Sequence, residues 1–198
     1  MMTLSPRRFA CLLLLVVVWT PEVLANTAAA PWRLCAEAVT RAGQKQGLPD
    51  GLLGAIAKVE SGRRRASDGE LLAWPWTVTA QGRGRFLPSK AAAIAEVQAL
   101  RARGMHSIDV GCMQINLRYH PDAFDNLDDA FDPARNAAAA ARLLAALRTA
   151  RGSWTGAVGI YHSARPTLNG PYRVKVFRTL FQDRRRAKQA TRSPRRPD

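Results

Sequence analysis

Apolar residues recur at helical spacing over most of the chain, so the sequence predicts a mainly helical protein. The pattern is clear in residues 32–46 and ends at Gly47 and Pro49. A second amphipathic stretch covers residues 52–60 and stops near Gly62, a residue type that often ends helices. Further helices are predicted at residues 90–103, 133–151 and 154–161.

Polar residues that can cap a helix precede three of these segments. They are Ser89, Asp132 and Ser153, and Asp132 is followed by a proline in the first turn of its helix. The last helix is predicted to begin at Pro171. Its apolar face is expected to consist of Val174, Phe177, Leu180 and Phe181.

Residues 74–87 depart from the helical pattern and predict a small β-hairpin. Two short β-prone runs flank a glycine turn at residues 81–84. The chain is long enough for one ordinary hydrophobic core. The expected fold class is therefore mainly α (α+β), with one domain over residues 26–183.

The two ends of the chain differ in character from this domain. Arg7 and Arg8 precede an apolar run and then Val23-Leu24-Ala25, which is typical of a cleaved signal peptide covering residues 1–25. The run is too short for a comfortable membrane span, and we expect an exported protein with no transmembrane segment after cleavage. Residues 184–198 are strongly basic without apolar periodicity, which predicts a disordered tail.

The net charge limits the kinds of molecule that the protein could bind. The net charge is +15, and such a chain could bind the polyanionic envelope or acidic lipid headgroups without being an enzyme. Nucleic acid is disfavoured as a partner by the export signal and by the concentration of charge in the tail.

The cysteines predict one disulfide. Cys11 would be lost with the signal, and Cys35 and Cys112 would then form an even pair in an oxidising compartment. We expect a disulfide, with two unpaired buried thiols as the alternative.

Glu60 lies on the apolar side of its predicted helix. Steps of four lead from Leu52 through Ile56 to Glu60, and the helix end places the carboxylate near the negative end of the helix dipole. Desolvation and dipole both raise the pKa of such an acid, as a protonated catalytic group requires. The alternative is a solvated glutamate at a frayed helix end.

Four blocks, in this order, resemble the soluble lytic transglycosylase and goose-type lysozyme superfamily, in particular its small exported members. They are Glu60-Ser61, the Gly-Cys-Met-Gln-Ile-Asn of residues 111–116, Asp132-Pro133 with Asn136, and residues 157–164 with Tyr161. The resemblance spans about residues 35–182 and implies a lysozyme-like domain. Cys112 replaces the usual leucine, and His162-Ser163-Ala164 replaces Asn-Ala-Gly.

The resemblance implies a peptidoglycan lytic transglycosylase that cuts between N-acetylmuramic acid and N-acetylglucosamine. Glu60 would protonate the leaving oxygen and then accept the proton of the muramic acid 6-hydroxyl, which gives a 1,6-anhydro product. A muramidase would need a second carboxylate to hold a water. The candidates for it are Asp68, Glu70 and Asp109, and the choice between the two reactions stays open.

The same resemblance implies substrate contacts from Ser61, Met113, Gln114 and Tyr161. Gln114 could donate to and accept from acetamido groups, and Met113 could offer an apolar wall to a sugar ring. The Tyr161 hydroxyl is expected beside the catalytic acid, where a hydrogen bond would orient the carboxyl group; core packing is the alternative for Tyr161 and for Met113. Asn116 and Asn136 are expected to bond nearby backbone, and so to tie down loops and a helix start, rather than to touch substrate.

Some aromatic and histidine side chains invite further functions. Trp74, Trp76 and Phe86 could stack on sugars or pack in the core. No cofactor is expected, and a metal is disfavoured because the three histidines, at 106, 120 and 162, lack a tight ligand spacing. The small exported form is similar to transglycosylases that serve an envelope-spanning secretion, pilus or flagellar assembly. We expect a monomer in the periplasm or envelope of a bacterium.

Overall fold

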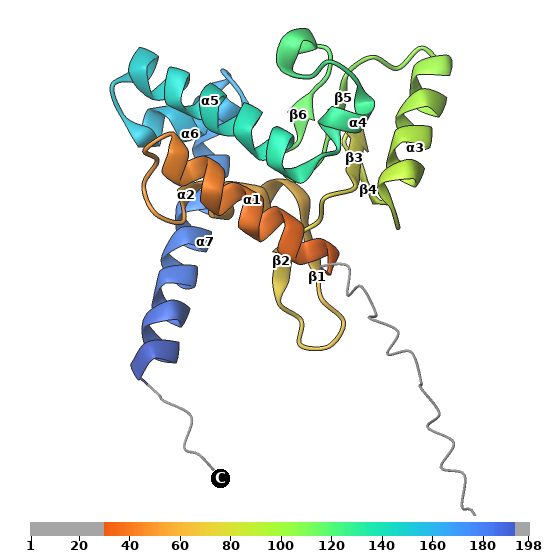
Figure 1. Cartoon of the computed structure of the whole chain (residues 1–198). Coiled ribbons are helices and arrows are strands. Elements are labelled where there is room, and N and C mark those ends of the chain that lie inside the picture. Colours follow the sequence, from red (N-terminus) through yellow and green to blue (C-terminus); the bar gives the residue numbers. More distant parts are fainter. Residues whose placement is uncertain (1–29, 193–198) are drawn as a thin grey trace, which may run out of the picture.

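The computed structural model describes residues 30–192 (Figure 1). The predicted signal segment and residues 193–198 lie outside the described part. The helices are α1 (Pro31–Lys45), α2 (Leu52–Ser61), α3 (Lys90–Ala102), α4 (Leu127–Ala130), α5 (Pro133–Arg151), α6 (Trp154–His162) and α7 (Pro166–Arg192), with a 3-10 turn at Pro121–Ala123. The strands are β1 (Gly62–Arg64), β2 (Leu71–Ala73), β3 (Thr77–Ala80), β4 (Arg83–Phe86), β5 (Ile108–Val110) and β6 (Ile115–Asn116). Within residues 30–192, every helix is too short or too polar to cross a lipid bilayer.

The predicted caps begin their helices as expected. The Ser89 hydroxyl accepts a hydrogen bond from the first turn of α3, and the Ser153 hydroxyl does the same for α6. Asp132 Oδ1 accepts from the backbone N–H of Arg135 at 2.8 Å, and Pro133 occupies the first turn of α5. Local capping chemistry therefore places these three helices, and the mainly helical fold class is confirmed.

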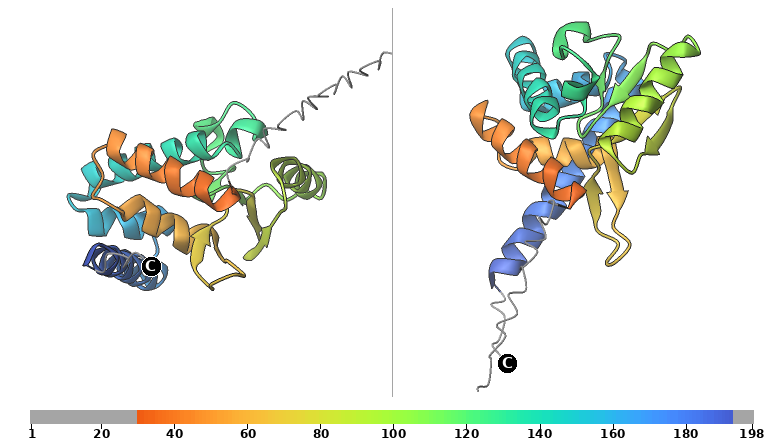
Figure 2. Two further views of the ribbon diagram at one scale, coloured as in Figure 1. Left: turned by 60° about the horizontal axis from the view of Figure 1, so that its bottom comes forward. Right: turned by 45° about the vertical axis from the view of Figure 1, so that its right-hand side comes forward.

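The main core lies among the helices. α1 packs against α5 and α2, and α7 packs against α2 and α6 (Figure 2). Cys35 of α1 is joined to Cys112 by a disulfide with a Cα–Cα distance of 5.8 Å, which confirms the expected pairing. Closing so long a loop stabilises a fold by roughly 3–5 kcal/mol in the chain-entropy account.

A small antiparallel sheet in the order β4-β3-β5-β6 forms the second core together with α3. The predicted hairpin is confirmed as β3 and β4, whose turn residues Gln81 and Gly82 both have positive φ. β5 and β6 add to it and were not predicted, because strands this short have no periodicity of their own. A separate hairpin, β1–β2, follows directly after α2.

The last helix differs from the prediction at its start and in its buried face. α7 begins at Pro166, with Pro171 inside it. Its buried residues are Tyr172, Val176 and Leu180, whereas Val174 and Phe181 are exposed. The buried stripe follows steps of four. Of the predicted face, Leu180 is buried in this stripe and Phe177 is partly buried against the core.

Residues 184–192 continue α7, so the prediction of a disordered tail is wrong for this part of it. Lys58 Nζ of α2 binds both carboxylate oxygens of Asp183 at 2.9 and 2.8 Å, and Arg184 donates to the Asp50 carbonyl at 2.8 Å. Arginine, lysine, alanine and glutamine also favour helix. The helix can therefore extend past the core, as Figure 1 shows, without an apolar stripe in its last turns.

Asn136 of α5 holds the segment between β5 and β6. The side chain is fully buried; its Oδ1 accepts from Met113 N at 2.9 Å, and its Nδ2 donates to the carbonyls of Val110 and Ala130 at 3.0 Å each. Gly111 fits against it because a Cβ there would lie 2.4 Å from Nδ2, and its φ of 81° suits glycine. Asn136 thus ties down loops, as expected.

We predict that Asn136→Ala lowers the free energy of unfolding by about 3 kcal/mol or more, because three buried backbone groups lose their partner. Urea denaturation followed by circular dichroism measures this. Asn126→Ala is the matched control, since Asn126 is an exposed cap of α4 and its loss should cost about 1 kcal/mol. Equal losses for the two variants would contradict the role of Asn136.

Candidate active site

Glu60 occupies the last turn of α2, as the sequence pattern predicted. Leu52 and Ile56, which precede it on the same face, are 1% and 0% exposed, and Glu60 itself is partly buried. Gly62 then allows the chain to leave the helix directly into β1, since a Cβ there would lie 2.1 Å from the Lys58 carbonyl oxygen. The packing of α2 therefore fixes the carboxyl group at the edge of the helical core.

The pKa of Glu60 is raised from 4.5 to about 7. Burial of the carboxyl group is the largest cause, and the negative charge of Asp109 raises the pKa further. The hydrogen bond from Tyr172 and the positive charge of Lys175 both lower it. Near neutral pH, Glu60 can thus exist as the acid or as the carboxylate.

The partner of the Glu60 carboxyl group is Tyr172 of α7, whose hydroxyl donates to Oε1. The Tyr172 ring is 7% exposed, and the imidazole of His162 stacks on it with ring centroids 4.4 Å apart and an interplanar angle of 5°. Burial and the neighbouring Glu60 charge raise the pKa of Tyr172 well above its ordinary value, so Tyr172 stays a donor. Sequence reasoning did not find Tyr172, although it heads the buried stripe of α7.

Tyr161 does not make the hydrogen bond expected of it. Its hydroxyl donates to the Met113 carbonyl at 2.8 Å, and so it supports the loop that follows β5. The pKa of Tyr161 is raised first by burial and then by the charges of Glu60 and Asp109. Tyr161 therefore lies in the electrostatic environment of the site, while Tyr172 orients the carboxyl group.

Ser61 and Met113 are buried and support the site from behind. The Ser61 hydroxyl donates to the Cys112 carbonyl at 2.7 Å and to the Ala57 carbonyl at 3.2 Å. Met113 is 0% exposed, so its side chain packs in the core and offers no wall to a sugar ring. Both residues were expected to contact substrate directly, but neither side chain is exposed for such a contact.

Gln114 is partly buried and has a φ of 49°. Its amide nitrogen donates to the carbonyls of Thr77 and Gly111 at 3.1 and 3.0 Å. These bonds orient the side chain and occupy both of its donor hydrogens. Gln114 was expected to donate to and accept from an acetamido group. With its amide nitrogen engaged, the side chain could contact such a group through its carbonyl oxygen.

Only Asp109, among the three candidates for a second carboxylate, acts on Glu60 electrostatically. Burial raises the pKa of Asp109, and the amide of Asn116 donates to its Oδ1 at 2.8 Å. Asp68 and Glu70 lie on the β1–β2 hairpin, where both pair with Arg65, and these contacts hold the pKa of Asp68 at about 2. The carboxylates of Asp68 and Glu70 are therefore both engaged by one guanidinium group.

The remaining predicted residues take supporting positions. Asn116 also accepts from the backbone N–H groups of Arg118 and Tyr119, so it bonds nearby backbone as expected. Trp74 is buried and donates to the Leu87 carbonyl at 2.7 Å, whereas Phe86 is 43% exposed. Residues 30–192 contain no group of three or more His, Cys, Asp or Glu side chains that could hold a metal ion.

Comparison with known proteins gives one match. A protein-family model described as Transglycosylase SLT domain matches residues 37–170. No curated protein and no solved structure matches the chain significantly. The matched region contains Glu60, Asn136, Tyr161 and the segment of residues 111–116, and it ends just before Tyr172. The chain belongs to the transglycosylase SLT domain family, a family of lytic transglycosylases whose substrate is peptidoglycan.

Proposed function

We propose that this protein cleaves the β-1,4 bond between N-acetylmuramic acid and N-acetylglucosamine in peptidoglycan, with formation of 1,6-anhydro-N-acetylmuramic acid. The observation that carries the proposal is the partly buried Glu60 carboxyl group, which accepts a hydrogen bond from Tyr172 and has its pKa raised to about 7. A carboxyl group with this pKa can donate and accept a proton at neutral pH.

Glu60 acts twice in this reaction. Its Oε1 accepts the hydrogen bond from Tyr172, so the acidic proton resides on Oε2 and passes to the glycosidic oxygen as the bond to C1 breaks. The carboxylate then accepts the proton of the muramic acid 6-hydroxyl as O6 bonds to C1. Glu60 ends the cycle protonated and no water is consumed. The substrate's N-acetyl group can stabilise the positive charge at C1 between these steps.

A muramidase is the second candidate, and Asp109 is the observation that favours it. Its carboxylate acts on Glu60 electrostatically and lies in the same partly buried environment. Against this, the Asn116 amide already donates to Oδ1 of Asp109, so part of the acceptor capacity of this carboxylate is occupied and less remains to hold a nucleophilic water. A non-catalytic envelope binder would have no need for a glutamic acid with a pKa near 7.

The export signal and the basic charge support a location where peptidoglycan is found. Residues 1–25 would direct export, and the periplasm or cell envelope of a bacterium is where peptidoglycan is met. The basic charge would favour retention at the envelope. We propose that the protein acts as a monomer that opens the wall locally for an envelope-spanning secretion, pilus or flagellar assembly.

Glu60→Gln is expected to lower the rate of glycan release from purified sacculi by at least about a thousandfold, while sacculus binding is retained. Mass spectrometry of the wild-type products should show anhydro ends, which lack one water relative to the reducing ends of a muramidase product. Glu37→Gln removes an exposed carboxylate of α1 and is the matched control. An unchanged rate for Glu60→Gln would exclude this mechanism, and reducing ends would identify a muramidase.

The pH dependence of cleavage should respond in opposite directions to two neighbours of Glu60. Activity is expected to fall as pH rises through about 7, where Glu60 loses its proton. Tyr172→Phe removes a hydrogen bond that lowers the Glu60 pKa, so this alkaline limb should move to higher pH, with a maximal rate reduced about tenfold. Asp109→Asn removes a charge that raises the pKa, so the limb should move to lower pH.

Profiles of kcat/KM against pH measure these shifts. Tyr119→Phe is the control for the tyrosine change, because Tyr119 is 70% exposed. Shifts in the same direction for Tyr172→Phe and Asp109→Asn would show that Glu60 does not set the alkaline limb.

Glu60 should also make stability depend on pH. Its pKa is raised in the folded state, so burial costs nothing below the ordinary value of 4.5, and the cost is complete above about 7. Wild-type stability therefore falls between these values by up to about 3 kcal/mol, and Glu60→Gln lacks this loss. Thermal unfolding at pH 4.5 and pH 8 measures the difference. A Glu60→Gln protein with no relative gain at pH 8 would contradict the burial of a carboxylate here.

A further inference from the structure

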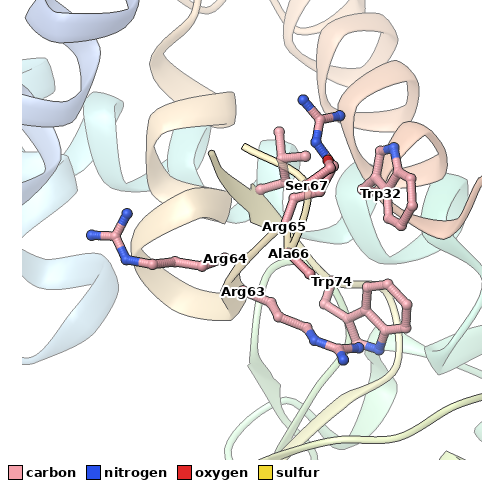
Figure 3. Close-up of a pocket in the computed structure, with 8 residues that line it drawn as sticks. Trp32, Arg63, Arg64, Arg65, Ala66, Ser67 and Trp74 are labelled. Atoms are coloured by element: carbon pink, nitrogen blue, oxygen red, sulfur yellow. The ribbon is translucent and has the colours of Figure 1, made fainter. Parts of the chain in front are cut away.

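A cavity of about 460 Å³ lies beside the β1–β2 hairpin and is separate from the contacts of Glu60 with Tyr172. Its walls come from α1, from the hairpin and from the segment before β3 (Figure 3). The lining residues include Trp32, Arg63, Arg65, Leu72 and Trp74. A cavity of this size, with aromatic walls and a few cations, has the character of a small-ligand site.

Three arginines line this cavity, and Arg63 is the one whose guanidinium lies against its aromatic wall. Arg64 donates to the Gly69 carbonyl at 2.9 Å, and its guanidinium points away from Trp74 in Figure 3. The Arg63 guanidinium group lies 4.6 Å from the centroid of the Trp74 ring and 6.0 Å from that of Phe86, and Figure 3 shows it lying against Trp74. The side chain is exposed and takes part in no ion pair among residues 30–192. Stacking therefore orders the planar group while leaving its N–H donors available.

Arg65 shows the contrast within the same cavity. Its guanidinium lies 5.9 Å from the Trp32 ring, but it is held by Asp68 and Glu70. On that side two carboxylates outnumber the one guanidinium, whereas the positive charge of Arg63 is compensated by no ion pair among residues 30–192. The cavity thus suits a ligand with a carboxylate next to an apolar part.

We propose that this cavity binds the stem peptide of peptidoglycan, with a peptide carboxylate on Arg63 and small apolar side chains against the neighbouring rings of Trp32 and Trp74, whose centroids lie 6.4 Å apart. The inference rests on the proposed function, because it assigns the cavity to the same polymer. Arg63 follows Glu60 by three residues, so their Cα atoms lie at most about 11 Å apart. A muramic acid near Glu60 can therefore bring its peptide to the cavity.

The charge of the polymer supports a peptide rather than a sugar. Both sugars of the glycan strand are neutral once the lactyl group of muramic acid is joined to the peptide by an amide bond. The carboxylates of the strand are then those of its peptides. Arginine binds a carboxylate through two parallel hydrogen bonds, which are stronger than bonds to neutral groups. A sugar ring alone would make no use of the charge on Arg63.

The test compares two probes that differ only in charge. They are N-acetylmuramyl-L-alanyl-D-glutamate and its diamide, in which both glutamate carboxylates are amides. Each is titrated into the ¹⁵N-labelled protein, and Kd is obtained from shifts of the indole N–H signals of Trp32 and Trp74. The acid is expected to bind about five- to tenfold more tightly than the diamide, and this preference should shrink as sodium chloride is raised.

Arg63→Gln should abolish the preference for the acid, whereas Arg101→Gln, which removes an exposed charge from the last turn of α3, should retain it. Equal affinities of the two probes for the wild type would overturn the proposal, as would a preference that survives in Arg63→Gln. Binding of pentaglutamate as tight as that of the acid probe would also overturn it, in favour of an acidic protein segment.

Neither probe contains a β-1,4 bond, so this result is independent of catalysis. If Glu60→Gln is inactive and the probes bind equally, the stem-peptide site falls while the lytic reaction stands. If Glu60→Gln lyses sacculi normally and the acid is still preferred, the mechanism falls while the carboxylate-binding cavity stands.

Discussion

The hydrogen bond between Tyr172 and the half-buried carboxyl group of Glu60 is the contact on which the site depends. It joins two helices, α2 and α7, that also share the Lys58–Asp183 ion pair. Because a buried carboxylate without a partner would be costly, the position of α7 and the chemistry of Glu60 are linked. Moving α7 would expose the acid, lower its pKa and remove its orientation at once.

A second set of contacts keeps the loop after β5 close to this pair. Asn136 binds the loop from α5, Ser61 binds it from α2, Tyr161 binds it from α6, and the disulfide at Cys112 ties it to α1. Most of these bonds end on backbone groups. The residues that carry the family pattern thus hold the backbone next to the C-terminal end of α2, where Glu60 lies.

Features set by residues close together in the sequence could be predicted, whereas features that depend on distant residues could not. Glu60 was found because its burial follows from the four-residue steps of its own helix, and the helix caps are equally local. Tyr172 could not be found in this way, since its partner is 112 residues away and its hydroxyl gives no signal on a buried stripe. The short strands β5 and β6 likewise depend on pairing with β3 and with each other.

Apolar periodicity predicts burial, and burial is not the same as helix formation. Residues 184–192 lack an apolar face, yet they are helical because their residue types favour helix and Asp183 and Arg184 anchor the preceding turn to α2 and Asp50. The same distinction applies to Met113 and Ser61. The family pattern predicted substrate contacts for both, whereas the packing places both side chains in the core.

A single carboxyl group that serves as acid and then as base needs a pKa near the pH at which it works. Burial raises the pKa of Glu60 and the charge of Asp109 raises it further, so both favour the protonated form over the carboxylate. Tyr172 and Lys175 oppose both by stabilising the carboxylate. Since the four influences come from α2, α7 and β5, the balance near pH 7 is a property of the packed domain, and no one element of the sequence could have set it.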